Sequence, residues 1–394
     1  MPKKLSRIFC AAICALVLAA CGRQEAEAPG TRRVFLMYSA AFSNLSPSIH
    51  SNEKQLYEGD DLPFVGSDDV LLIYSHHTSK GGVYNIPTNP ILCRAYKDMT
   101  GSIRKDTLIV YPDTDISASA ETLRKVLTDV QDLFPASNYG LLVSSHGKGW
   151  IPPGYKEESP SIFSVDSTKE LGQEAVDNSG IDIRDLPGAI PMHLEFFIMD
   201  ACLMGCVEVA YELKDQCDYI VFSPTEILSY GMIYPPMLRR LLVSGKPDLQ
   251  AVCEDYMEYY NAQTGSYNSA TITLVDCSKL DALAAACAPL TEKYRTAIGK
   301  LDRNKVQAYF YNELHWFYDL RDIFAQAGAS LTELAQLDAA LDECVLYKDA
   351  TPTFFGLKLL RVCGLSSYIP MPERESLNDY YKTLSWNKAT GLIQ

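Results

Sequence analysis

A strand and the turn after it are visible in FFIMDACLMG, residues 196–205. Residues 196–199 are apolar without interruption, which is typical of a strand that is covered on both faces of a sheet. Asp200 and Cys202 follow, and residues 204–214 then carry apolar side chains at helical spacing. The stretch therefore predicts a strand-to-helix turn of an α/β fold, with a thiol in the turn.

A second strand with a reactive end lies upstream, in YGLLVSSHGKGW, residues 139–150. The apolar residues 141–144 lead to His146, and Gly147 follows. The carboxyl ends of parallel strands meet at one edge of an α/β sheet, which is where ligands bind in such folds. We therefore expect His146 and Cys202 to lie together, with Cys202 as a nucleophile that His146 activates.

Apolar runs alternate with helical patterns along much of the chain. The predicted strands are residues 34–38, 70–74, 108–111, 141–144, 196–199 and 219–222. Residues 119–133 and 204–214 show the periodicity of helices. Such alternation indicates an α/β fold with a mostly parallel central sheet and helices on both of its faces.

The chain turns helix-rich after residue 278. Helical patterns cover residues 280–294, 316–327 and 331–341, and residues 357–362 and 364–370 each suit a strand. We therefore predict four parts. They are a signal peptide at 1–20, a flexible tether at 21–32, a catalytic domain at 33–275, and a helix-rich C-terminal subdomain at 276–394 that packs on the catalytic domain.

The amino terminus carries an export signal. Three basic residues stand before the apolar run 8–20: Lys3, Lys4 and Arg7. The sequence LAACG at 18–22 resembles a bacterial lipobox, which implies cleavage before Cys21 and lipid attachment to its thiol. A transmembrane anchor is the alternative, but the run is shorter than the ~20 residues that span a bilayer. We therefore expect a lipid-anchored protein of the bacterial cell envelope, exported to a periplasmic or surface face.

The charge of the chain argues against nucleic acid as a partner. Without residues 1–20 the chain has 32 basic and 49 acidic residues, a net charge of −17. An acidic surface of this kind repels a phosphate backbone.

The cysteines indicate a free thiol. Of twelve, Cys10 and Cys14 leave with the signal peptide and Cys21 takes the lipid, so nine remain. An odd number leaves at least one unpaired unless two chains are bridged, and Cys202 is the candidate. No Cys-x-x-Cys pair is present, so neither a zinc site nor a dense disulfide framework is indicated.

The two turns together resemble a known family. HGKGW at 146–150 and DACLMGCVEVAYEL at 200–213 are similar to the clostripain family of cysteine peptidases, in the clan that also holds caspases, legumains and gingipains. The resemblance implies a caspase-like three-layer sandwich and a cysteine endopeptidase whose chemistry requires no cofactor. Clostripain itself depends on calcium, so the resemblance leaves calcium open for this chain.

The resemblance also implies roles for individual residues. His146 would protonate the leaving amine, and no third residue is obligatory. Asp200 matches the aspartate at the base of the primary specificity pocket, which selects Arg or Lys before the cleaved bond, since a buried carboxylate favours a cation. Glu226 is a second acid for the pocket wall, although the family usually has two consecutive acids and then Gly-Trp, where this chain has Pro-Thr-Glu and Gly-Met. We expect a monomer that acts on proteins or peptides with Arg or Lys before the cleaved bond.

Two further features would support the thiol chemistry. A helix that begins near Met204 would place its positive end close to the sulfur and lower the thiol pKa. The backbone amides of Gly147 and Cys202 are the expected donors to the oxyanion, because glycine lets the backbone approach a substrate closely.

A long segment rich in Pro, Gly and Lys covers residues 151–180. Segments of this length inside a domain are usually functional or mobile. Enzymes of the clostripain family are commonly activated by cleavage in this region, and the candidate sites are Lys148, Lys156 and Lys169. We predict self-processing after Lys156 or Lys169.

Two other functions are compatible with the same residues. One is a non-catalytic caspase-like surface lipoprotein that binds a peptide or a glycan, which the presence of both His146 and Cys202 disfavours. The other is an acyltransferase or transpeptidase, in which an amine resolves the acyl-enzyme in place of water.

The remaining histidines do not predict a metal site. His76 and His77 follow a predicted strand, but no third ligand at a suitable spacing comes after them. We interpret this pair as loop or rim residues, and His50 and His193 as ordinary surface residues.

Overall fold

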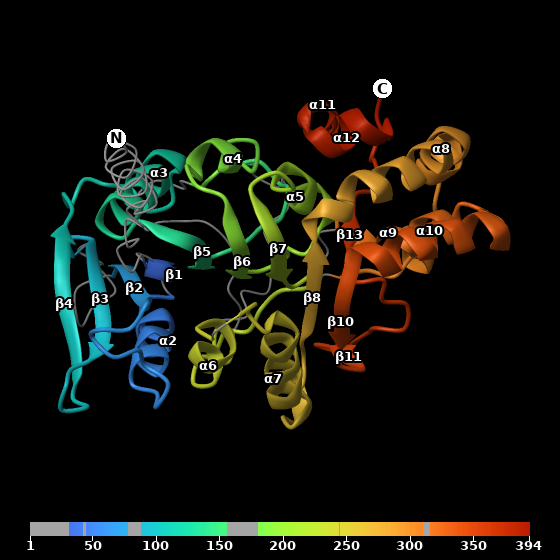
Figure 1. Cartoon of the computed structure of the whole chain (residues 1–394). Helices are drawn as coiled ribbons and strands as arrows, with labels where there is room; N and C mark the ends of the chain where they lie inside the picture. The colour runs from blue at the N-terminus through green and yellow to red at the C-terminus, as the bar shows by residue number, and fades with distance from the viewer. Residues whose placement is uncertain (1–30, 42–44, 78–87, 156–179, 244, 310–315) are drawn as a thin grey trace, which may run out of the picture. The chain divides into compact units, whose positions relative to one another are not determined.

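A nine-stranded mixed sheet forms the centre of the protein in the computed structural model (Figure 1). The strand order is β10-β8-β7-β6-β5-β1-β2-β3-β4. The structure describes residues 31–41, 45–77, 88–155, 180–243, 245–309 and 316–394, with only the backbone of Thr31. Thr31–Gln394 make one compact unit.

Five neighbouring strands in the middle of the sheet are parallel. They are β1 Thr31–Ala40, β2 Asp69–His76, β5 Ala136–Ser144, β6 Leu194–Asp200 and β7 Cys217–Phe222. All eight residues of β2 are buried, as expected for a strand with helices on both sides. The predicted mostly parallel sheet is confirmed, and each of these strands contains a predicted apolar run. Thr31 and Arg32, predicted to belong to the tether, are the first residues of β1.

Antiparallel pairs complete the sheet at both edges. One edge consists of β3 Ile91–Lys97 and β4 Ile103–Val110, and the other of β8 Thr271–Asp276 and β10 Val345–Ala350. Only part of β4 was predicted, and the expectation that it is covered on both faces is wrong. This strand is exposed along nearly its whole length, and its run of charged residues at 104–106 suits an edge strand.

Helices cover the two faces of the sheet and produce the three-layer sandwich (Figure 1). One face carries α2 Ser46–Tyr57, α6 Met237–Leu241 and α7 Leu249–Asn261. The opposite face carries α3 Ala120–Leu133, α4 Leu186–Ala189, α5 Val207–Glu212 and α8 Leu280–Ile298. Each set of helices buries one side of the parallel strands in its own hydrophobic core.

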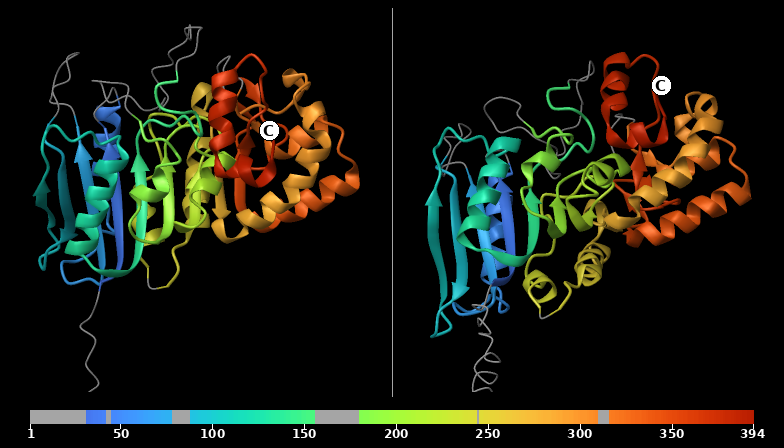
Figure 2. Two further views of the ribbon diagram at one scale, coloured as in Figure 1. Left: turned by 90° about the horizontal axis from the view of Figure 1, so that it is seen from above. Right: turned by 45° about the horizontal axis from the view of Figure 1, so that its top comes forward.

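The C-terminal third continues the same unit. The boundary predicted between residues 275 and 276 falls before the last residue of β8, and β10, beyond it in the chain, pairs with β8. The short helices α11 Glu375–Thr383 and α12 Ser385–Thr390 pack near α5 and α8 (Figure 2). The remaining elements are α9 Leu320–Gln326, α10 Leu331–Cys344, the two-residue strands β9 Tyr318–Asp319, β11 Thr353–Phe354, β12 Leu357–Lys358 and β13 Ser366–Ser367, and the 3-10 turns η1 Gly265–Tyr267, η2 Cys277–Lys279 and η3 Arg303–Lys305.

The cysteines that the structure describes are all free and buried, nine in number. Within the same residues, none of the helices has both the length and the apolar character needed to span a bilayer.

A buried ion pair ties the amino ends of the strands together. Arg33 of β1 is 1% exposed, and its guanidinium donates to both carboxylate oxygens of Glu195 in β6, at 2.7 and 3.1 Å. The same guanidinium donates to three backbone carbonyls at and after the end of α6, those of Leu241, Val243 and Gly245. These five hydrogen bonds compensate for the cost of burying the charge.

Replacement of Arg33 by Ala should destabilise the fold strongly, because it leaves the Glu195 carboxylate and three carbonyls without their donor. Loss of one partner of a buried ion pair typically costs about 3–5 kcal/mol. Urea unfolding measures the change. Arg104→Ala, which breaks an exposed pair with Asp98, is the matched control and should cost about 0–1 kcal/mol. Equal effects of the two substitutions would contradict this role of Arg33.

Candidate active site

The two predicted turns leave the sheet side by side. Strands β5 and β6 are parallel, and Ser144 is opposite Asp200 at their carboxyl ends. The backbone N–H of Ser145 donates to the carbonyl of Asp200 at 3.4 Å, so the pairing persists one residue past β5. His146 and Cys202 each come two residues after that last pair and emerge at the same edge.

Direct backbone contact between the turns occurs at Gly147. A Cβ on this residue would lie 2.1 Å from the carbonyl oxygen of Cys202 and 2.6 Å from its amide nitrogen. The φ angle of Gly147 is not in the left-handed region, so close approach is what requires glycine here. His146 therefore belongs to a segment that touches the backbone of the thiol-bearing residue.

The sulfur of Cys202 is enclosed. The residue is 0% exposed, and its Sγ accepts a hydrogen bond from the amide of Ile227 at 3.3 Å. The thiol lies 3.6 Å from the carbonyl oxygen of the same residue, to which it donates. One residue of the loop after β7 thus contacts the sulfur through both of its backbone polar groups.

The turn around Cys202 is held against the loop that follows β7. The amide of Leu203 donates to the carbonyl of Thr225 at 2.9 Å, and that of Gly205 donates to the carbonyl of Ser223 at 2.8 Å. Leu203 has a φ angle of 59°, a conformation that costs a non-glycine residue roughly 1–2 kcal/mol. The two backbone hydrogen bonds offset this strain and fix the turn.

The loop after β7 is itself fixed by buried hydroxyls. The Oγ1 of Thr271 in β8 lies 2.9 Å from the Oγ of Ser223 and 2.8 Å from the Oγ1 of Thr225, and it accepts from the amide of Thr225 at 3.1 Å. All three side chains are 0% exposed. A strand that the sequence did not predict therefore positions the loop that contacts the sulfur.

The helix after the thiol begins later than predicted. Helix α5 spans only Val207–Glu212, with Cys206 at its N-cap, so it begins three residues after Met204. The first turn of α5 also contains the buried acid Glu208. The predicted helix start near Met204 is therefore wrong, and the inference that a helix end there lowers the thiol pKa loses its basis. Burial raises the pKa of the neighbouring Cys206 thiol well above its ordinary value, which is consistent with a packing role for that residue.

Asp200 is buried among hydroxyl groups. Its Oδ2 accepts from Ser144 Oγ at 2.8 Å and from the hydroxyl of Tyr234 at 2.5 Å, and the residue is 0% exposed. Burial and the neighbouring Asp200 carboxylate raise the pKa values of Tyr234, Tyr256 and Tyr260 well above the ordinary range. The hydroxyl groups of these tyrosines therefore stay protonated at neutral pH, and the hydroxyl of Tyr234 donates a hydrogen bond to the carboxylate.

The other predicted site residues are distributed as follows. Glu226 is 6% exposed and directly precedes Ile227, so it lies in the loop that contacts the sulfur. Lys148 is half-buried and begins the turn to the fully buried Trp150. Three residues fall outside the described part of the chain: Cys21, Lys156 and Lys169.

Several residues that shape this site had no signal in the sequence. Ile227 contacts the sulfur through its backbone, so its side-chain type carries no information. Tyr234 and Thr271 are distant in the chain from Asp200 and Thr225. Ser144 is the exception that the sequence could have indicated, because it stands two residues before His146 on the predicted strand.

Comparison with known proteins places this geometry in context. A sequence model of the clostripain family matches residues 94–390. No curated protein matched the chain. The X-ray structure of an inactive zymogen C11 protease from Parabacteroides distasonis is similar, with a TM-score of 0.75 and 28% identity over 92% of this chain and 99% of that one.

A second C11 protease of known structure is also similar. The secreted C11 cysteine protease of Bacteroides thetaiotaomicron, iotapain, has a TM-score of 0.74 and 25% identity over 92% of this chain and 99% of its own. A structure of a secreted C11 cysteine protease from the same organism, in complex with an irreversible peptide inhibitor, has a TM-score of 0.72 and 25% identity over 91% and 98% of the two chains. The family match covers well over half of the chain and includes both His146 and Cys202, so the chain belongs to the clostripain family and is a cysteine-type endopeptidase.

Proposed function

We propose that this peptidase cleaves peptide bonds after Arg or Lys, with Cys202 as the nucleophile and His146 as the acid–base group. The observation that carries the assignment is the contact between Gly147 and the backbone of Cys202, which brings the two turns together at one sheet edge. Ser144 and Asp200 are paired at the ends of their strands. The imidazole of His146 and the thiol of Cys202 each come two residues after this pair.

The reaction follows from the groups at this edge. The Sγ of Cys202 attacks the carbonyl carbon of the substrate, and its proton passes to His146. His146 then gives the proton to the leaving amine, and water hydrolyses the acyl-enzyme. The amides of Gly147 and Cys202 are the proposed donors to the oxyanion, and one such donor is typically worth about 2.7–4 kcal/mol of activation energy.

Preference for a basic residue is assigned to Asp200. Its carboxylate is buried on the same segment as the nucleophile, two residues before it, and polar contacts from Ser144 and Tyr234 hold it in place. A buried carboxylate interacts strongly with an incoming cation, because little water screens the pair. Glu226, in the loop next to the sulfur, is the proposed second acid of the pocket.

The enclosed sulfur supports a need for activation. Cys202 is 0% exposed and hydrogen-bonded to Ile227, so a carbonyl reaches its sulfur only when a local movement uncovers it for a short time. We propose that self-cleavage after Lys156 or Lys169 removes this restriction. Cleavage after Lys148 is disfavoured, because Trp150 packs against Phe317, Tyr368 and Tyr381 and anchors the turn.

The remaining proposals concern location and state. Export with a lipid on Cys21 rests on the signal and lipobox pattern of residues 1–22. The peptidase is proposed to act as a monomer on protein or peptide substrates. Its chemistry needs no organic cofactor, and the resemblance to clostripain is the one reason to test the effect of calcium.

Substitution of Cys202 by Ala should abolish both self-cleavage and reaction with an irreversible probe that carries Lys or Arg before its electrophile. The wild-type chain should split within residues 148–180 and be labelled, whereas the variant stays intact and unlabelled on a denaturing gel. Cys93→Ala, which removes a buried thiol of β3, is the control and should behave as wild type. A Cys202→Ala chain that still splits during purification would show that another protease performs the cleavage, and a wild type that is never labelled would favour the binding lipoprotein.

Substitution of Gly147 by Ala should lower kcat by roughly 10²–10³-fold, the usual effect of losing an oxyanion donor. The added Cβ would overlap the Cys202 carbonyl at 2.1 Å, so one of the two backbones must shift. Steady-state hydrolysis of a Lys substrate measures the loss, and circular dichroism checks the fold. Gly66→Ala adds a Cβ with nothing within 4 Å and should leave kcat unchanged. Full activity of Gly147→Ala would remove Gly147 from the site.

Substitution of Asp200 by Asn should weaken the preference for basic residues. The amide can still accept hydrogen bonds from Ser144 and Tyr234, but the charge that pairs with the substrate cation is lost. Loss of one partner of a buried charge pair costs at least about 2 kcal/mol, which is roughly a 30-fold fall in kcat/KM for Lys and Arg substrates. The exposed Asp218→Asn is the control. An unchanged ratio of Lys to Leu cleavage would assign the specificity to another residue.

A further inference from the structure

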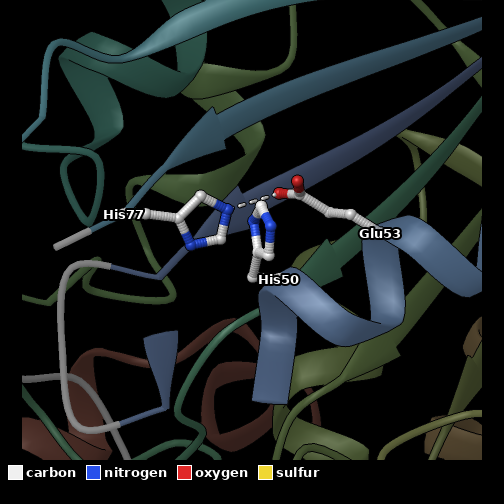
Figure 3. A group of neighbouring side chains, drawn as sticks. All are labelled: His50, Glu53 and His77. Carbon is white, nitrogen blue, oxygen red and sulfur yellow. Dashed lines mark hydrogen bonds and ion pairs between the residues drawn. The ribbon is translucent and has the colours of Figure 1, made fainter. Parts of the chain in front are cut away.

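Three potential metal ligands converge at the carboxyl end of β2, away from the thiol. His50 and Glu53 stand three residues apart on α2, and His77 directly follows β2 (Figure 3). Side chains at i and i+3 of a helix lie on one face, so both α2 residues can turn toward the strand end. In Figure 3 the imidazole of His77 points at the Glu53 carboxylate, and the His50 ring lies beside both.

The distances suit a small cation. Each residue offers one ligand atom, and the three atoms all lie within 4.8 Å of one another. The Nε2 of His77 is 3.0 Å from Oε1 of Glu53. Ligand atoms of a tetrahedral zinc ion lie ~3.3 Å apart, as follows from metal–ligand distances of ~2.0–2.1 Å. Only a small movement of His50 is needed, and this residue is exposed on the helix surface.

Hydrogen bonds orient two of the ligands from behind. The Oγ of Ser75 donates to Oε2 of Glu53 at 3.0 Å, which leaves Oε1 facing the imidazoles. The Oγ of Ser46 lies 3.3 Å from Nδ1 of His77. If Nδ1 carries the proton and donates to Ser46, the lone pair of Nε2 points toward Glu53 and His50. Metal-binding histidines and carboxylates almost always have such supporting partners.

Burial gives the site one closed and one open side. The side chains of Glu53 and His77 are 1% and 13% exposed, whereas His50 is exposed. A carboxylate removed from water to this degree needs compensation by charge or hydrogen bonds. A divalent ion would supply that compensation and would keep a position toward solvent for water.

The competing explanation is a simple ion pair. A protonated His77 would pair with Glu53, and His50 would contact the His77 ring edge to face, as the centroid distance of 4.9 Å and the interplanar angle of 85° allow. In that arrangement His50 contributes nothing to cation binding. The two explanations therefore differ in the role of His50.

We propose that His50, Glu53 and His77 bind a zinc ion, with water in the remaining position. Two imidazoles and a carboxylate are ligands that zinc commonly takes in proteins. The ion would join α2 to the end of β2, and β1 separates this end from β5, so the site is distinct from the Cys202 turn. The sequence did not indicate the site, because the partners of His77 lie upstream of it on a helix.

Metal titration of the full chain tests the proposal. A Cys202→Ala background removes the catalytic thiol as a competing ligand. After treatment with a chelating resin, Zn²⁺ is titrated against a chromophoric chelator, and Co²⁺ is added separately to record visible absorption. We expect one bound zinc ion per chain, a higher unfolding temperature with zinc, and a Co²⁺ spectrum of low coordination number.

Variants then locate the ion. His50→Gln and Glu53→Gln should lose the Co²⁺ spectrum, and Ser75→Ala should weaken zinc binding by roughly 10–100-fold. His193→Gln, which alters an exposed histidine paired with Asp218, is the control and should bind as the parent does. Because His50 is exposed, its replacement should leave the fold intact by circular dichroism even if Glu53→Gln does not fold. The absence of bound zinc in the parent, or equal zinc affinity in His50→Gln, would overturn the proposal and leave the ion pair.

Discussion

Close contact between the backbones of Gly147 and Cys202 is the constraint on which the site depends. The parallel register of β5 and β6 brings the two turns to one edge, but register alone leaves room for side chains between them. Because Gly147 has no Cβ, the Cys202 carbonyl can lie where that atom would be, and the two backbones come into contact. The position of His146 relative to the thiol is therefore determined by backbone packing, which tolerates less variation than contact between flexible side chains.

The contacts that enclose the proposed nucleophile Cys202 differ in strength. The hydrogen bonds of Cys202 to Ile227 are individually weak, and a net contribution of about 1 kcal/mol is typical of one such bond. The Thr271 hydroxyl network that holds residues 223–225 is buried and costly to break. We therefore expect exposure of the sulfur to involve a local movement at Ile227, while the turn and its supporting strand β8 stay in place.

The sequence predicted the parts of the fold that depend on local apolar pattern. Runs such as 141–144 and 196–199 became central strands, because burial on both faces selects continuous apolar residues. The strands β3 and β8, each next to an edge strand of the sheet, were missed, since their polar and apolar residues mix without such a run. The late start of α5 was also beyond a local pattern: the amides of Leu203 and Gly205 bond to the loop after β7, and this tertiary pairing replaces the first helical turn. In the site, motif spacing indicated His146, Gly147, Asp200 and Cys202, whereas Ile227, Tyr234 and Thr271 contribute through contacts that no motif encodes.

The hydroxyl groups around Asp200 connect the enclosed state to the proposed specificity. Burial of a carboxylate without hydrogen-bond donors is costly. Ser144 and Tyr234 supply donors, so hydrogen bonds stabilise the carboxylate before any substrate arrives. These hydroxyls are neutral and cannot cancel the charge, which a Lys or Arg side chain can. In the proposed pocket the two donors therefore stabilise the Asp200 carboxylate when no cation is bound. They leave its negative charge in place, so a Lys or Arg side chain still binds more favourably than a neutral one, as selection of a basic residue requires.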